Sequence, residues 1–109
     1  MINLTPHAIS VGALTVAPSG RMLRLVEADS AVGETAGIPV IRRIYSLPDL
    51  ATVAPVAPDT IYLVSAIALP YCAGRADIFA PDTGSGAIRD AAGRITGTTR
   101  LIAAPEVRS

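Results

Sequence analysis

The feature that most restricts the fold of this sequence is the spacing of its helix-breaking residues. Nine prolines and nine glycines are spread along 109 residues, and a proline inside a helix removes a hydrogen bond and clashes with the preceding turn. Between them lie short runs rich in β-branched residues, of which residues 60–65 are the clearest. Such runs are typical of strands. We therefore expect much more strand than helix, and no helix longer than about three turns.

Short strands can be placed along most of the chain from the alternation of apolar and polar residues. The expected strands cover residues 2–11, 13–17, 22–28, 38–46, 60–65, 78–80, 86–90 and 94–103. A Pro-Ser-Gly turn predicts that 13–17 pairs with 22–28, and an Ala-Ala-Gly turn predicts that 86–90 pairs with 94–103. The segment 29–37 has little apolar content, so we expect a surface loop there.

The run 38–46 carries one arginine on each of its two faces. Val40, Arg42 and Ile44 alternate with Ile41, Arg43 and Tyr45. Because an unpaired buried charge is costly, at least one of these arginines is expected to reach solvent or a partner.

Helix is expected in two places only. A single turn is predicted to start within residues 47–50, and a second short helix within 65–74 must break at Pro70 or begin near it. Gly74 is expected to end that helix. The fold class is therefore mostly β or α+β, as a small barrel or a strongly curved antiparallel sheet of about seven short strands with one short helix. We expect a single domain over 1–104 and a loose tail over 105–109.

Composition excludes several classes of protein. Half the residues are hydrophobic, so disorder is not expected, yet no apolar run approaches the roughly 18 residues that span a membrane. Nine acidic and nine basic residues balance, which argues against nucleic-acid binding. The N-terminus lacks the pattern of a signal peptide, and the single Cys72 excludes an internal disulfide and fits a reducing compartment. We expect a cytoplasmic protein.

All nine basic residues are arginines. Guanidinium binds phosphate and carboxylate through two parallel hydrogen bonds, so the bias fits recognition of an anion. A GC-rich genome explains the same bias and also the nineteen alanines. Individual arginines flanked by turn residues are better candidates for a site than the bias itself.

The residues available for catalysis are few. His7 is the only histidine and Cys72 the only cysteine, and a cysteine hydrolase needs the two brought together with an orienting group. Zinc sites normally draw on four such ligands. We therefore expect no enzyme activity, no catalytic residue, no metal and no cofactor.

Two weaker signals have a structural explanation beside the functional one. Asp77, Asp82 and Asp90 fit either an oxygen-rich magnesium site or turn formation. The segment Thr83-Gly84-Ser85-Gly86 resembles part of a phosphate loop, but it lacks the lysine and the following long helix. It fits either a nest of backbone N–H groups for an anion or a turn before a hairpin.

One set of polar residues remains as a candidate ligand site. Asn3, Thr5 and His7 form a polar stripe at strand spacing, and if this strand pairs near 60–65 the stripe meets the turns that follow. The predicted ligand-binding residues are Thr5, His7, Tyr62, Ser65, Arg75, Asp77, Asp82, Thr83, Arg89 and Asp90. Arginine would hold an anion, aspartate would accept hydrogen bonds and tyrosine would stack. The alternative is that pairs such as Arg75–Asp77 and Arg89–Asp90 hold loops in place.

Several short motifs resemble a group of small proteins from phages, prophages and actinobacteria. They are Asn3-Leu4-Thr5-Pro6-His7, Tyr62-Leu63-Val64-Ser65, Arg75-x-Asp77 followed by Ala80-Pro81-Asp82-Thr83-Gly84, and the hairpin from Arg89 to Ile95. The likeness covers most of the chain and is weakest over 18–58. The resemblance implies origin more than mechanism, and a phage-encoded protein of this kind would act in the host cell cytoplasm. By analogy of type alone it resembles counter-defence proteins that sequester immune nucleotide signals.

The expected function is a non-enzymatic binding protein that captures a small anionic, nucleotide-like ligand, as a phage sponge for an immune signal. The alternative is a protein-binding inhibitor or accessory factor that acts through a sheet edge without a ligand. A homo-oligomer is expected because exposed sheet edges need covering. A sponge needs a concave polar site, whereas an inhibitor needs an exposed apolar or charged patch.

Overall fold

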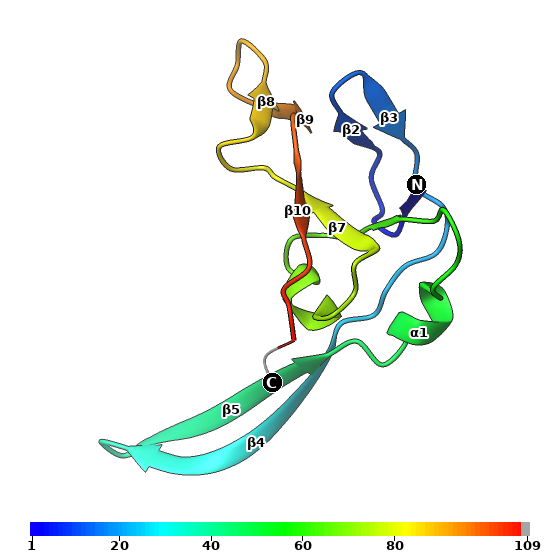
Figure 1. Cartoon of the computed structure of the whole chain (residues 1–109). Coiled ribbons are helices and arrows are strands. Elements are labelled where there is room, and N and C mark those ends of the chain that lie inside the picture. Colours follow the sequence, from blue (N-terminus) through cyan, green and yellow to red (C-terminus); the bar gives the residue numbers. More distant parts are fainter. Residues whose placement is uncertain (108–109) are drawn as a thin grey trace.

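The computed structural model describes residues 1–107, and within them the fold is mostly β with one short α-helix, as predicted (Figure 1). Ten short strands in this part of the chain form three separate sheets. No sheet among these residues closes into a barrel, so the architecture differs from the single barrel or curved sheet expected from the sequence.

The first sheet forms the centre of the body. Its strand order is β1-β6-β7-β10, with β1, β6 and β7 parallel and β10 antiparallel to β7. The bounds are β1 Ile2–Asn3, β6 Tyr62–Leu63, β7 Ile78–Pro81 and β10 Leu101–Ala103. Tyr62, Leu63 and Ile78 are completely buried, which fits the predicted central position of the uncharged 60–65 segment.

Two helical turns pack against this sheet. Helix α1 (Leu50–Val53) contributes partly buried apolar side chains, and the 3₁₀ helix η1 (Leu69–Cys72) buries its first and last residues in the core. The proline of η1 lies in its first turn, where a missing N–H costs nothing, and Gly74 follows with φ of 85°. The predicted helix over 65–74 is therefore present but shorter.

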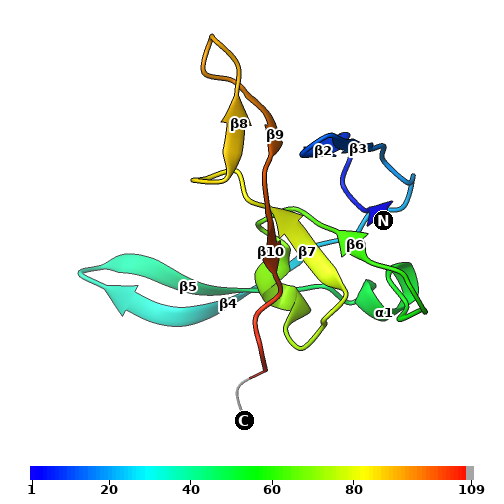
Figure 2. The same cartoon turned by 45° about the horizontal axis from the view of Figure 1, so that its top comes forward.

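The second sheet has the strand order β3-β2-β9-β8 and stands above the first in Figure 2. The bounds are β3 Leu14–Val16, β2 Ile9–Val11, β9 Ile95–Thr98 and β8 Ala87–Arg89. The chain passes directly from β9 into β10, so the two sheets are joined at residues 99–100. Gly97 allows close approach of the backbones here, because a Cβ at this position would lie 2.9 Å from the Ser10 carbonyl oxygen.

The third sheet is a long hairpin that projects from the body (Figures 1 and 2). We call it the arm; it consists of β4 (Val26–Thr35), β5 (Ile38–Ser46) and the turn between them. Ala36 and Gly37 both have positive φ, 52° and 78°, which matches the twist of a two-residue hairpin turn. The radius of gyration is 16.8 Å, whereas a compact domain of this length has about 13 Å.

Several predicted strands were wrong in extent or pairing. The strand expected over 2–11 is split into β1 and β2, because the side chain of Asn3 folds residues 5–7 into a turn. Strand β3 pairs with β2 and not with 22–28. The loop expected over 29–37 is the end of β4 and the hairpin turn, and its partner is β5.

The C-terminal predictions have a mixed outcome. Strands β8 and β9 form the expected hairpin, but 101–103 leaves it and pairs with β7 instead. At the start of 105–109, the segment for which a loose tail is expected, the Pro105 carbonyl accepts a hydrogen bond from the Gly74 N–H at 2.9 Å. Residues 108–109 lie outside the described part of the chain.

Candidate functional site

Asn3 is the centre of a buried polar cluster at the N-terminus. Its side-chain amide donates to the carbonyl oxygens of His7 at 2.7 Å and Val16 at 3.0 Å, and its side-chain oxygen accepts from the N–H and hydroxyl of Thr5 at 2.9 and 2.7 Å. The side chain of Asn3 is fully buried, whereas His7 is exposed. The Asn-Leu-Thr-Pro-His motif therefore has a structural explanation, since it closes the turn between β1 and β2.

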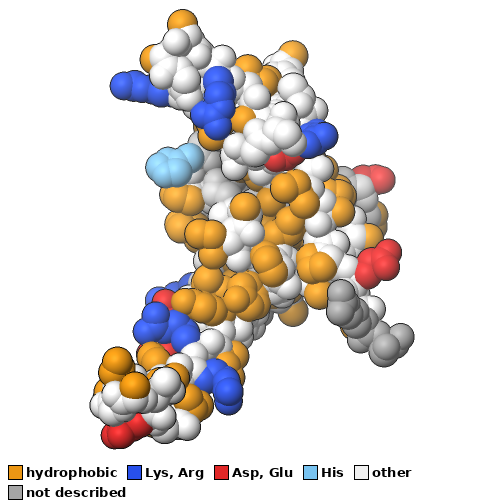
Figure 3. Space-filling view, turned by 90° about the vertical axis from the view of Figure 1, so that its left-hand side faces the viewer, with side chains coloured by type: hydrophobic (Ala, Val, Ile, Leu, Met, Phe, Trp, Pro, Cys, Tyr) orange, Lys and Arg blue, Asp and Glu red, His pale blue; other side chains and the backbone are white. Residues whose placement is uncertain are grey.

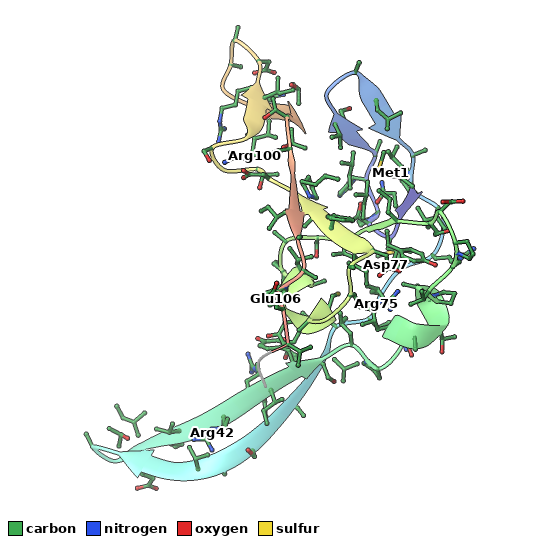
Figure 4. The ribbon with its side chains drawn as sticks, viewed as in Figure 1. Met1, Arg42, Arg75, Asp77, Arg100 and Glu106 are labelled. Carbon is green, nitrogen blue, oxygen red and sulfur yellow. The ribbon has the colours of Figure 1, made fainter. Side chains whose placement is uncertain are left out.

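Arg75 and Asp77 form an ion pair beside the core, the arrangement that a loop-holding role requires. The guanidinium donates to both carboxylate oxygens of Asp77 at 2.9 Å and to the Ala54 carbonyl at 2.6 Å, and each side chain is 17% exposed. The guanidinium holds the pKa of Asp77 below its ordinary value. Two of the guanidinium nitrogens are thus committed to partners within the chain (Figure 4).

The same ion pair lies at the wall of a wide hollow, which we call the Arg75 cleft. It has a volume of about 690 Å³. Its lining includes Met1, Val56, Asp59, Thr60, Arg75 and Asp77. Asp59 has φ of 54°, which is uncommon for a residue other than glycine. The volume lies within the range of small-molecule sites, roughly 300–1,000 Å³.

Asp82 belongs to a separate cluster at the junction of the two larger sheets. Its carboxylate accepts from the Arg100 guanidinium at 2.6 Å and from the Gly84 N–H at 2.9 Å, and these bonds lower its pKa. The buried Thr98 hydroxyl donates to the Asp82 carbonyl at 2.7 Å. A Cβ at Gly86 would lie 2.8 Å from the Asp82 carboxylate. The glycine-rich segment 83–86 is thus wrapped around a carboxylate, which opposes binding of a second anion there.

Arg89 and Asp90 lie in the β8–β9 hairpin and do not pair with each other. The Arg89 guanidinium donates to the Gly93 carbonyl at 2.8 Å. The Asp90 carboxylate accepts from the N–H groups of Ala92 and Arg94, both at 2.9 Å, which is the ordinary role of aspartate in a turn. Both side chains serve their own hairpin.

Tyr62, in β6, and Ser65, just after it, bond to nearby backbone. The Tyr62 hydroxyl donates to the Pro55 carbonyl and the Ser65 hydroxyl accepts from the Ala68 N–H, so both fix local backbone. Thr5 and Ser65 line one small hollow of about 100 Å³. Cys72 is fully buried, and burial raises the pKa of its thiol.

The structure therefore brings the ten predicted site residues together only in small groups. Thr5 and His7 meet around Asn3, Thr5 and Ser65 share a hollow, and Arg75 and Asp77 share the Arg75 cleft. Thr83 lines a different hollow of about 150 Å³ with residues of β2 and β9. The predicted pairing of the first strand with 60–65 is present, as Ile2 aligns with Tyr62. The convergence of all ten on one rim is not.

The arm has an exposed apolar face that the site prediction from the sequence did not include. The β4–β5 register places four large aliphatic side chains on one face of the ribbon: Val26, Ile38, Val40 and Ile44. We call this the apolar face of the arm; its four large side chains are between 36% and 65% exposed. Figure 3 shows hydrophobic side chains on the surface of the arm and of the neighbouring body.

The opposite face of the arm carries an ion-paired group of charged side chains and the exposed Ile41. The Arg43 guanidinium donates to Asp29 at 2.8 and 3.1 Å and lies 3.5 Å from Glu27, and these carboxylates raise its pKa. At the base of this face, the rings of Tyr45 and Tyr71 lie 6.1 Å apart, which connects the arm to the body. The two arginines predicted on opposite faces of 38–46 therefore differ: Arg43 is paired across the strands, while Arg42 lies on the apolar face.

The alternation in 38–46 was the available signal for this amphipathic arm. The partner strand and turn, 29–37, contain glycine, serine and acidic residues, and this composition predicts a loop. Comparison with known proteins adds no further information: no family model, no curated protein and no solved structure matches the chain.

Within residues 1–107, no helix is long and apolar enough to cross a membrane, and no group of three or more acidic, histidine or cysteine side chains is arranged to hold a metal ion.

Proposed function

We propose that this protein is a non-enzymatic interaction protein that engages a protein partner through the apolar face of its arm. The observation that carries the proposal is a projecting, two-stranded ribbon with one apolar and one ion-paired face. An isolated hairpin is marginally stable in water, and an apolar patch of a few hundred Å² on a protein surface is often a functional one. A partner on this face would stabilise the hairpin and cover the patch.

The energy available from this face sets the kind of contact that it supports. Burying a valine or isoleucine completely is worth about 1.5–3 kcal/mol. The four large side chains are about half exposed on average, so covering them is worth about 3–6 kcal/mol in total. Association costs about 4–15 kcal/mol. One arm lying on a flat surface would therefore bind weakly, and stable binding requires further contacts around the arm.

A photo-reactive phenylalanine analogue at Ile44 tests this function. Ile44 lies on the apolar face and is 58% exposed, and Ile41, on the opposite face, is 51% exposed and provides the matched control. In cells of the natural source, light should cross-link the Ile44 variant to one protein in defined yield and the Ile41 variant much less. Equal labelling from both positions, or none from either, would contradict a role for this face.

A second candidate function is capture of a small anionic, nucleotide-like ligand in the Arg75 cleft. The volume of about 690 Å³ and the presence of one guanidinium in its wall favour it. Because two of the guanidinium nitrogens of Arg75 are already bonded, a ligand would have to use the remaining one or displace Asp77. The protein would then act as a sponge without altering the ligand.

Native mass spectrometry of the purified protein tests the second candidate. A ligand of this kind should appear as a stoichiometric added mass, and Arg75→Ala should weaken its binding roughly 10- to 150-fold, as expected for loss of a charged hydrogen-bonding group. Arg89→Ala is the control, because Arg89 is not part of the cleft wall. Thermal melts of both variants are needed, since Arg75 also supports the fold. Equal affinities in the two variants would exclude the Arg75 cleft.

A further inference from the structure

We infer that the partner of the arm is a second copy of this chain, with each arm lying across the body of the other copy. The inference rests on the proposed function and specifies its partner. The arm is fixed at its base by the contact between Tyr45 and Tyr71, and Figure 2 shows it leading away from the body. A ribbon held in this way presents its apolar face to another molecule, not to its own chain.

The area that the arm offers favours reciprocal exchange over contact between the two arms alone. Strand β5 has nine residues, and at about 3.3 Å per residue and about 10 Å across two strands one face of the ribbon covers about 300 Å². Two arms packed face to face would therefore bury only about 600 Å², whereas stable interfaces bury about 1,200–2,000 Å². If each arm lies on the partner's body, two such contacts form and the total reaches about 1,200 Å².

The receiving surface is a groove at the lower end of the body. It has a volume of about 310 Å³ and is lined by residues 74–76 on one side and by Ala103 to Glu106 on the other. Ile102 and Val107, which flank the second side in the chain, are 42% and 68% exposed. The groove thus combines uncovered apolar surface with the Glu106 carboxylate and with Arg75, whose charge is already paired with Asp77.

Charge supports the match between the arm and this groove. Arg42 is the one charged residue that the register places on the apolar face, and Glu106 lies at the groove (Figure 4). Neither forms an ion pair within residues 1–107, although Arg43, Arg75 and Arg100 all do. In an exchanged dimer each Arg42 would meet the Glu106 of the other copy, so the apolar face would not bury an unpaired charge.

Sedimentation equilibrium of the intact chain and four variants tests this arrangement. The wild-type chain should have twice the mass of the 11.2 kDa monomer. Ile44→Asp and Arg42→Glu should each raise the dissociation constant at least 10-fold, while Ile41→Asp, on the opposite face, should leave it within about 3-fold. Adding Glu106→Arg to Arg42→Glu should restore most of the affinity, because the ion pair is re-formed with reversed signs. Circular dichroism checks that every variant is folded.

The results separate this inference from the proposed function. A monomeric wild-type chain, a dimer indifferent to Ile44→Asp, or failure of the reversed pair to restore association would each overturn the exchanged dimer. If the chain is monomeric but the Ile44 photo-reactive variant still cross-links to another protein, the inference falls and the proposed function stands. If the chain is monomeric and no face-specific cross-link forms, both fall.

Discussion

Replacing Asn3 tests whether the N-terminal motif is structural. Its side chain is fully buried and makes four hydrogen bonds, two as a donor and two as an acceptor. A hydrogen bond contributes about 0.5–1.5 kcal/mol net, and a buried group left without its partner costs about 1–3 kcal/mol. Asn3→Ala removes all four bonds and strands the Val16 carbonyl, so we expect a loss of about 2–4 kcal/mol of unfolding free energy.

Two further variants show which bonds matter. Thr5→Val removes the hydroxyl that bonds to the Asn3 side-chain oxygen and to the His7 carbonyl and leaves the other bonds of Asn3, so the loss should be about 1 kcal/mol. Asn3→Asp keeps the acceptor but loses both donors and points a carboxylate at two carbonyl oxygens. Burial should raise the pKa of this new carboxyl. Protonation then favours the folded state, so the deficit relative to wild type should shrink as pH is lowered.

Urea unfolding followed by circular dichroism measures these free energies. A typical domain has about 5–15 kcal/mol of stability, so the Asn3→Ala loss is a large fraction and should lower the midpoint clearly. A loss below about 1 kcal/mol for Asn3→Ala, with unchanged slope, would refute the structural role. In that case the motif would again be a candidate for ligand binding.

Two other predictions concern stability. The Arg75–Asp77 pair depresses the pKa of Asp77. Its contribution to the free energy of unfolding is therefore complete above the ordinary carboxyl pKa of about 4 and is lost as pH falls toward the lower folded pKa. Asp77→Asn should flatten this acid dependence of unfolding, and an unchanged profile would contradict the role of the pair. Gly97→Ala should destabilise the junction of β2 and β9 by about 1–3 kcal/mol, because the new Cβ meets the Ser10 carbonyl oxygen at 2.9 Å. A melting temperature within one degree of wild type would contradict this, since it would show that the two backbones move apart at little cost.

The local sequence was sufficient to predict the structure of three segments. The uncharged run at 60–65 does contain the central strand, and proline in the first turn of η1 and Gly74 after it set that helix as predicted. The β8–β9 hairpin also follows from its turn residues. For the helix and the hairpin, the decisive interaction lies within a few residues of the pattern that predicts it. The central strand pairs with the distant β1 and β7, and there the absence of charge predicts its burial.

Sequence reasoning failed where one side chain overrides the pattern of its neighbours. Alternation predicted one continuous strand over 2–11, but the amide of Asn3 bonds to the carbonyl oxygens of His7 and Val16 and bends the chain between them. The segment 29–37 failed for a different reason. Its residues are polar because they face solvent on a projecting ribbon, and no periodicity distinguishes such a strand from a loop.

The size of the core explains why the predicted ligand residues became structural ones. Only ten hydrophobic residues are buried among those described, and they lie around one small sheet. The second sheet and its turns have almost no share in that core, so polar bonds such as those of Thr98 and Asp82 fix them instead. In a domain with so small a core, the side chain of an arginine or aspartate beside a turn is used for hydrogen bonds that hold the fold, before any ligand. Large apolar side chains that could have enlarged the core are left exposed instead, and those of the arm are Val26, Val32, Ile38, Val40, Ile41 and Ile44.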